Sequence, residues 1–232
     1  MLPIPEKNAG RDGPHTLAAA LWRERWSFLT PLALLSAFTA LCFLAPIDMA
    51  SSRYVYLTPF DGWAGDYWFT EDLCYYASPV PGIVLGIGAC LVLVVGLWSS
   101  ALAKRRQAAG LLLCVVLAGP LILVNGVLKP GMSRPRPCQL ATFGGGNPQV
   151  VYVAPWQASS AVGKSFPSGH ASMGFLWMAP AFLYWRRNYW ASAAWLTIGV
   201  VLGLAVGYFR MAVGAHFVSD IVWSGGIVYF SG

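Results

Sequence analysis

Long runs of apolar residues, separated by short polar stretches, dominate the pattern along this chain. Five runs are clear and a sixth begins near residue 212; the five cover residues 26–46, 79–100, 107–128, roughly 170–185 and 189–209. Most of them approach the roughly 20 residues that an α-helix needs to cross the hydrocarbon core of a bilayer. The pattern therefore predicts an all-α, polytopic membrane protein with six transmembrane helices in a single domain, residues 1–232.

Three of these runs have unusual features. Residues 170–185 are few for a spanning helix, so we expect this run to begin below the membrane surface, in surroundings lined by protein. Pro120 lies inside residues 107–128 and should kink that helix or remove one of its backbone hydrogen bonds. The sixth run reaches Gly232 without a basic flank, so we expect the natural chain to continue beyond it.

The positions of basic residues predict the orientation of the helices, because Lys and Arg are enriched in cytoplasmic loops. Nine basic residues would be cytoplasmic if both termini are: Lys7, Arg11, Arg23, Arg25, Lys104, Arg105, Arg106, Arg186 and Arg187. Five acidic residues gather between the first two runs: Asp48, Asp61, Asp66, Glu71 and Asp72. We therefore expect a bacterial-type inner membrane protein with a cytoplasmic tail at residues 1–25. The outer loops would be residues 47–78 and 129–169.

Composition agrees with this class of protein. The chain is 57% hydrophobic and 10% charged, whereas soluble domains carry about a quarter charged residues. A net charge of +6 could indicate nucleic-acid binding in a soluble protein, but here the basic residues flank apolar helices. The bilayer is therefore the expected surroundings, and nucleic acid is not an expected partner. The N-terminal residues also lack the apolar core and cleavage site of a removable signal peptide.

Separate segments bring ionisable side chains to the outer ends of the predicted helices. They are Lys129 and Arg136, then His170 directly after Ser168 and Gly169, and finally Arg210, His216 and Asp220. Such groups are costly to keep at the ends of membrane helices and are usually functional. The predicted topology places all of them on one side, so we expect them to form one site facing the periplasm or exterior.

Part of this set suits a tetrahedral polyanion such as phosphate. Lys129, Arg136 and Arg210 supply positive charge, and guanidinium groups match phosphate oxygens with paired hydrogen bonds. Ser168 and Gly169 stand at the predicted start of a helix, where backbone N–H groups and the helix dipole favour an anion. The absence of a side chain at glycine allows a ligand to approach the backbone closely.

The remaining groups suit nucleophilic catalysis. His216 and Asp220 are four residues apart and would share a helix face, so the carboxylate can hold one ring nitrogen protonated while the other attacks. His170 can protonate the leaving oxygen and later deprotonate water. Arg134 and Lys164 lie nearby, and the sequence leaves open whether they serve the site or are ordinary interfacial charges.

These residues resemble the three motifs of the type 2 phosphatidic acid phosphatase (PAP2) family, which is related to bacterial acid phosphatases and vanadium haloperoxidases. The matching positions are Lys129 with Arg136 and Pro137, then Pro167, Ser168, Gly169 and His170, then Arg210 with His216 and Asp220. Phe209 departs from the pattern, because the family usually has serine there. The substitution removes one hydroxyl group next to Arg210.

The resemblance implies an activity. In the family, the histidine matching His216 forms a phosphohistidine, the aspartate matching Asp220 orients it, and the histidine matching His170 acts as acid and then base, without a metal or other cofactor. The expected function is therefore a metal-independent phosphatase acting on a phosphorylated membrane lipid, such as a polyprenyl pyrophosphate, phosphatidic acid, phosphatidylglycerol phosphate or lipid A. A lipid-to-lipid phosphotransferase and a non-catalytic lipid-binding protein are the alternatives. The headgroup and the oligomeric state stay open.

The first outer loop carries many aromatic residues, which favour the bilayer interface, and we expect them to form a packed cap. Three of the five cysteines, Cys42, Cys90 and Cys114, lie in apolar runs and are expected to pack as small hydrophobic side chains. Cys74 and Cys138 both fall on the predicted outer side. A disulfide between them is possible in an oxidising compartment, and it would tie the cap to the loop that carries Arg136.

Overall fold

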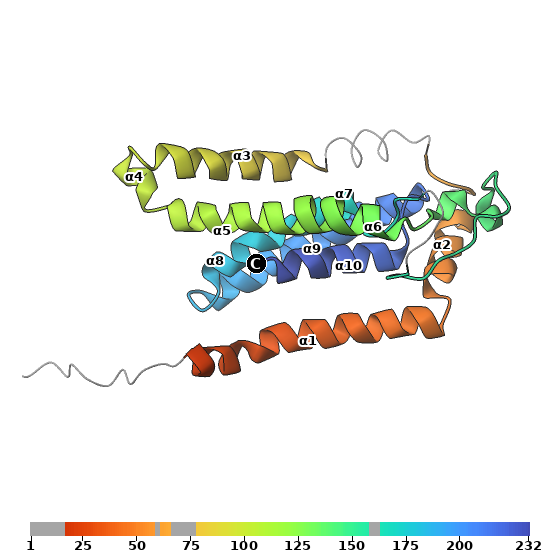
Figure 1. Ribbon diagram of the computed structural model, residues 1–232, viewed down its shortest axis with the longest axis horizontal. Coiled ribbons are helices and arrows are strands. Elements are labelled where there is room, and N and C mark those ends of the chain that lie inside the picture. Colours follow the sequence, from red (N-terminus) through yellow and green to blue (C-terminus); the bar gives the residue numbers. More distant parts are fainter. Residues whose placement is uncertain (1–16, 59–60, 66–77, 158–162) are drawn as a thin grey trace, which may run out of the picture.

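The computed structural model describes residues 17–58, 61–65, 78–157 and 163–232. Within these ranges every regular element is a helix, as predicted. The longer elements lie side by side along one direction, and α2 lies across one end of them (Figure 1). The α-helices are α1 (Leu17–Leu44), α2 (Ile47–Leu57), α3 (Val80–Val95), α4 (Ser100–Ala103), α5 (Arg106–Val116), α6 (Lys129–Met132), α7 (Gly169–Phe175), α8 (Ala179–Tyr184), α9 (Tyr189–Ala212) and α10 (Val218–Phe230).

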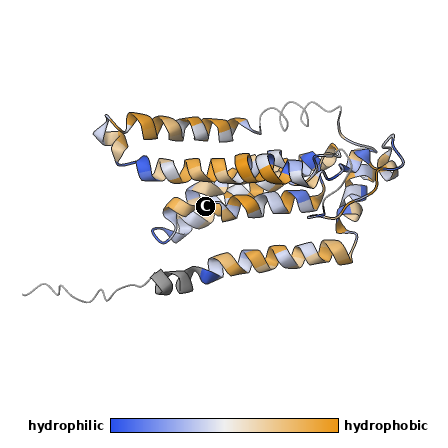
Figure 2. Cartoon of the chain, in the orientation of Figure 1, coloured by the Kyte–Doolittle hydropathy of each residue, from blue (hydrophilic) through white to orange (hydrophobic). Residues whose placement is uncertain are grey.

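Three helical segments of the described chain are long and apolar enough to cross a membrane: Arg25–Leu44, Arg106–Gln139 and Tyr189–Ala212. Gly82–Val95 and Val218–Phe230 are shorter apolar helices. Hydrophobic residues cover the lengths of the helices, and hydrophilic residues gather at their ends (Figure 2). The all-helical membrane architecture is thus present, and the number of six crossings stays a prediction.

The run predicted to begin inside the protein is a broken helix. It consists of α7, the 3₁₀ turn η5 (Leu176–Met178) and α8. Residues along all three pieces are buried, and α7 packs against α9, α10 and the π-helix described next. Surrounding protein thus covers this irregular backbone, as the shortness of the run predicts.

The helix that contains Pro120 changes type at Leu117, one turn before this proline. α5 is followed by a π-helix, η2 (Leu117–Leu128), and η2 continues into α6. Proline cannot donate a backbone hydrogen bond, and a π-helix closes its bonds one residue further along than an α-helix. The predicted break in the α-helical pattern is therefore confirmed.

Glycines on α9 allow the broken helix and α10 to pack closely. A Cβ atom at Gly203 would lie 2.3 Å from the ring of Phe175, and one at Gly207 would lie 2.4 Å from Ile221. Small residues at helix contacts let membrane helices approach one another. This packing fixes α7 and α10, the two helices that carry candidate catalytic residues.

Candidate active site

The candidate residues lie at the end of the bundle where α2, α6 and the turn between α9 and α10 meet (Figure 1). Part of the predicted aromatic cap covers this end: the ring centroids of Tyr56 and Trp63 are 4.9 Å apart, and those of Trp63 and Phe143 are 5.4 Å apart. Phe143 also forms a buried cluster with Leu140 and Phe217, against which Tyr56 and Trp63 pack. The cap is therefore packed where the structure describes it, and residues 66–77 lie outside the described ranges.

His216 lies in the turn between α9 and α10 and is only 1% exposed. Its Nδ1 atom is 2.6 Å from the carbonyl oxygen of Ser165 and 3.7 Å from Oδ2 of Asp220. Because a carbonyl oxygen can only accept, Nδ1 donates its hydrogen to Ser165 and Nε2 keeps its lone pair. The carboxylate was expected to hold Nδ1 directly. The structure instead gives the hydrogen bond to Ser165 and places the carboxylate just beyond hydrogen-bond distance.

Burial also keeps this histidine uncharged. It lowers the pKa of His216 from 6.5 to about 4, because the charged ring would lose its hydration. The charge of Asp220 opposes this shift, and those of Lys129 and Arg210 add to it. At neutral pH the ring is therefore neutral, which is the state a nucleophile requires.

Asp220 lies in the first turn of α10 and is fully buried. Its Oδ2 accepts hydrogen bonds from the Ser165 hydroxyl at 2.6 Å and from the backbone N–H of Phe217 at 2.7 Å. Its Oδ1 accepts from Arg134 Nη1 at 2.5 Å. The carboxylate is therefore fixed from three directions, and Ser165 joins it to the imidazole.

Arg134 is not an interfacial charge. Its side chain is 1% exposed, and besides Asp220 it donates to Asp48 Oδ2 at 2.7 Å and to the carbonyl oxygen of Val153 at 2.7 Å. The guanidinium carbon lies 4.3 Å from the ring centroid of Phe217, a cation–π contact. The sequence left open that Arg134 is an ordinary charge at the membrane interface, and this alternative is therefore wrong.

Asp48 is a part of this region that the sequence did not reveal. It lies in the first turn of α2 and is fully buried. Its carboxylate accepts hydrogen bonds from the backbone N–H and hydroxyl of Ser219, at 2.9 and 2.6 Å, and from the Tyr152 hydroxyl at 3.0 Å. Among the five acidic residues of the first outer loop, nothing in the local sequence distinguishes it.

Lys129 and Gly169 meet on the other side of the candidate site. A Cβ atom at Gly169 would lie 3.2 Å from Lys129 Nζ and 2.8 Å from Oδ1 of Asn125. Glycine is therefore needed for this close approach. Asn125, four residues before Lys129 on the same helical run, is a second neighbour that the sequence did not suggest. The hydroxyl of Ser168 accepts from Ala171 N at 3.3 Å and so caps α7.

The other predicted cations gather around Lys129. Arg136 and Arg210 both act on it electrostatically, as does the exposed Lys164. Arg210 lies in the last turn of α9 and is 6% exposed, whereas Arg136 is half-buried. His170 is the second residue of α7 and half-buried. Lys129, Arg136, Arg210 and His216 are thus brought into one region, and the role of His170 stays a prediction.

Two further predictions concern metal binding and a disulfide. In the described ranges, no group of three His, Cys, Asp or Glu side chains could hold a metal ion, and metal independence stays a prediction. Cys138 is present as a half-buried thiol. Its suggested partner Cys74 lies outside the described residues, so that disulfide also stays a prediction.

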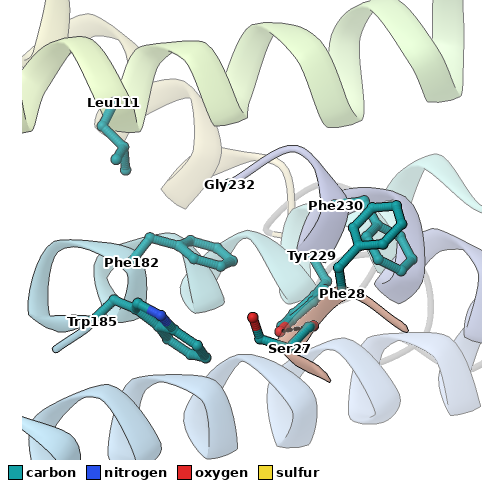
Figure 3. A pocket seen from close by; sticks show the side chains of 8 residues that line it. All are labelled: Ser27, Phe28, Leu111, Phe182, Trp185, Tyr229, Phe230 and Gly232. Carbon is teal, nitrogen blue, oxygen red and sulfur yellow. Dashed lines mark hydrogen bonds between the residues drawn. The ribbon is translucent and has the colours of Figure 1, made fainter. Parts of the chain in front are cut away.

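A cavity of about 270 Å³ lies away from this region (Figure 3). Its walls come from the start of α1, from α5, from the end of α8 and from the last residues of α10. The catalytic candidate Asp220 stands at the opposite end of α10. The cavity is lined by Ser27, Phe28, Leu111, Phe182, Trp185, Tyr229, Phe230 and Gly232. None of the residues predicted to bind or cleave phosphate is among them.

The fold and this site define a class: an all-helical membrane protein with a buried histidine next to a cluster of cations at one end of its helices. Comparison with known proteins identifies the family. The chain belongs to the PAP2 superfamily, whose family model matches residues 108–231.

The curated relatives share one name, lipid A 4'-phosphatase. The protein from Francisella tularensis subsp. novicida is 30% identical over 184 residues, which are 78% of each chain. The one from Rhizobium leguminosarum is 35% identical over 137 residues, 56% of this chain and 54% of the relative. A third, from Rhizobium etli, is 32% identical over 137 residues, 56% of this chain and 49% of the relative. No solved structure matches the chain.

Proposed function

We propose that this protein is an integral membrane phosphatase that removes a phosphate group from a lipid. The observation that carries the proposal is His216: a buried, neutral imidazole whose Nδ1 is held by Ser165 lies beside the charges of Lys129 and Arg210. A nucleophilic nitrogen and a cluster of cations are what the transfer of an anionic phosphoryl group requires. Membership of the PAP2 superfamily supports the same reading.

In the proposed reaction, Lys129, Arg136 and Arg210 bind the phosphate oxygens, together with backbone N–H groups near Ser168 and Gly169. Nε2 of His216 then attacks phosphorus, and the bond from phosphorus to the lipid oxygen breaks. His170 donates a proton to that leaving oxygen.

A phosphohistidine and a dephosphorylated lipid alcohol result. In the second half of the reaction, His170 takes a proton from water, and the water oxygen attacks phosphorus. The N–P bond breaks and its electron pair returns to Nε2, so inorganic phosphate leaves and His216 is restored. Asp220 stabilises the imidazolium charge that forms while phosphorus is bound.

The same proposal includes the topology. Six crossings with both termini in the cytoplasm would place this site on the periplasmic or exterior side of a bacterial inner membrane. The distribution of basic residues supports this orientation. In this topology the three long and two shorter apolar helices would be five crossings, and the broken run from α7 to α8 would be the sixth.

The names of the relatives make lipid A the first substrate to test. Purified protein in detergent should be given lipid A, phosphatidic acid, phosphatidylglycerol phosphate and a polyprenyl pyrophosphate, and inorganic phosphate should be measured. We expect release that persists in excess chelator and disappears in His216→Ala. A phosphorylated acceptor lipid in place of free phosphate would indicate a phosphotransferase. No release above the His216→Ala background from any of these lipids would overturn the proposal.

A further inference from the structure

A buried ion-pair chain connects α2 to the candidate nucleophile. Arg134 binds Asp48 through Nη2 at 2.7 Å and Asp220 through Nη1 at 2.5 Å. The Ser165 hydroxyl donates to Asp220 at 2.6 Å, and the Ser165 carbonyl accepts from Nδ1 of His216 at 2.6 Å. Every link from α2 to the imidazole is therefore a direct hydrogen bond.

The burial of this chain makes its geometry demanding. Asp48, Asp220 and Arg134 are each at most 1% exposed, so water cannot replace a lost partner. Removing one member of a buried ion pair leaves an uncompensated charge, which is strongly destabilising. A change at Asp48 therefore affects Arg134, because its Nη2 group loses a hydrogen-bond acceptor and the guanidinium would have to find another.

The arrangement also has a charge consequence. Two carboxylates, Asp48 and Asp220, share the guanidinium of Arg134. These three side chains together therefore carry one more negative than positive charge. If Asp48 were neutral, Arg134 would be free to neutralise Asp220 completely. The imidazole ring, which becomes positive when its Nε2 forms a bond to phosphorus, would then have no net negative charge behind it.

From these contacts we infer that Asp48 is a positioning residue for the phosphoryl-transfer reaction: it holds Arg134 so that Asp220 and Ser165 fix His216 in its attacking state. Asp48 does not touch the substrate in this arrangement and acts through Arg134. The inference rests on the proposed function, and it adds a residue from the first outer loop to a site whose other predicted members lie between residues 129 and 220.

The test compares Asp48→Asn with Arg53→Gln, a variant on the exposed side of the same helix. Asp48→Asn should lower kcat about 10- to 100-fold, the range found for partners that orient metal-binding side chains, and KM should change little. Arg53→Gln should keep both values. A correctly folded Asp48→Asn protein with wild-type kcat would overturn the inference.

A double-variant cycle separates positioning from a general loss of stability. Ser165→Ala removes the hydroxyl that binds Asp220 but keeps the carbonyl that binds His216. If Asp48 and Ser165 act through the same chain, Asp48→Asn with Ser165→Ala should lose less activity than the product of the two single losses. Multiplicative losses, as expected for Arg53→Gln with Ser165→Ala, would overturn the inference.

Where Asp48→Asn does not fold, Tyr152→Phe takes its place, because it removes one hydrogen bond to the same carboxylate without changing any charge. We expect a loss in kcat of about two- to five-fold, with the same coupling to Ser165→Ala. Wild-type kcat in Tyr152→Phe would then count against the inference.

A second measurement needs no activity. In protein labelled with ¹⁵N-histidine, the Nδ1–H proton of His216 should be protected from exchange by its bond to Ser165, and His216→Ala identifies its signal. Faster exchange of this proton in Asp48→Asn supports the inference, and unchanged exchange overturns it. If Asp48→Asn does not fold, the same comparison is made with Tyr152→Phe. If wild-type protein releases no phosphate from any lipid, the proposed function fails, and this signal still decides whether Asp48 positions His216.

Discussion

In the proposed reaction, His216 attacks phosphorus without first losing a proton. The carbonyl of Ser165 fixes the Nδ1 hydrogen, and burial keeps the ring neutral. A separate base to activate the nucleophile is therefore unnecessary. In the proposed reaction, His170 is the residue that donates and accepts protons. Substitutions of His170 and His216 should therefore have different effects on the reaction.

Substitution of His170 should reveal the covalent intermediate. His170→Ala lacks the group that deprotonates water, so with a substrate whose leaving group needs no proton, phosphate should accumulate on His216. Mass spectrometry of peptides kept above neutral pH should find this phosphohistidine in His170→Ala. It should be absent from His170→Ala combined with His216→Ala. A lack of covalent phosphate in both proteins would contradict the two-step reaction.

The protonation of His216 should also contribute to stability, with a definite sign. Because the folded-state pKa of about 4 lies below the ordinary value of 6.5, the unfolded chain binds a proton first as the pH falls. Stability is therefore unaffected above pH 6.5 and decreases between pH 6.5 and 4. Compared with His216→Asn, which cannot take up this proton, the wild-type melting temperature should fall more between pH 7.5 and 5. Parallel curves for the two proteins would disagree with this assignment.

At the scale of elements, the packing of α9 against α7 determines where His170 and Gly169 lie. A methyl group at Gly203 would lie 2.3 Å from the ring of Phe175, but one at Gly88 on α3 meets no atom within 4 Å. Gly203→Ala should therefore lower the stability by about 1–3 kcal/mol and reduce activity with it. Gly88→Ala should be tolerated. Thermal unfolding and phosphate release measured on both variants check this, and equal stability of the two would contradict the packing argument.

The helices and the family motifs could be predicted from the sequence because both are local properties. Apolar runs identify membrane helices, and a fixed motif spacing brings Asp220 close to His216. The helix face predicted for this pair is wrong, because α10 begins at Val218 and His216 lies in the turn before it. The position of Arg134 could not be predicted. Its partner Asp48 is 86 residues away, and a lone carboxylate in an acidic loop has no pattern that marks it. Helix α2 was likewise unexpected, because its aromatic residues indicated only a packed loop.

The hydrogen bond from His216 to Ser165 was also beyond sequence reasoning. A spacing of four residues correctly placed Asp220 near the ring, but it gave no information on backbone carbonyls. Ser165 comes from the loop before α7, 51 residues before His216. Loop backbones are positioned by tertiary contacts, here including the bond from Ser165 N to the carbonyl of Arg134 at 3.0 Å.

For the molecule as a whole, the proposed orientation predicts which surface lysines are reachable from outside. Lys164 is exposed near the candidate site, and Lys104 is exposed at the turn between α4 and α5. In spheroplasts, an amine reagent that cannot cross the membrane should label Lys164 and spare Lys104. After the membrane is permeabilised, both should react. Labelling of Lys104 alone in intact spheroplasts would reverse the orientation and place the site in the cytoplasm.

The ion pairs that join α2 to α10 have a consequence for the biosynthesis of the protein. Asp48 leaves the ribosome long before Arg134, and Asp220 follows only when most of the chain has been made. The carboxylate of Asp48 therefore stays hydrated until Arg134 has been translated. The ion pairs can be completed only after Asp220 has been translated, so every nascent chain that ends before Asp220 should be inactive.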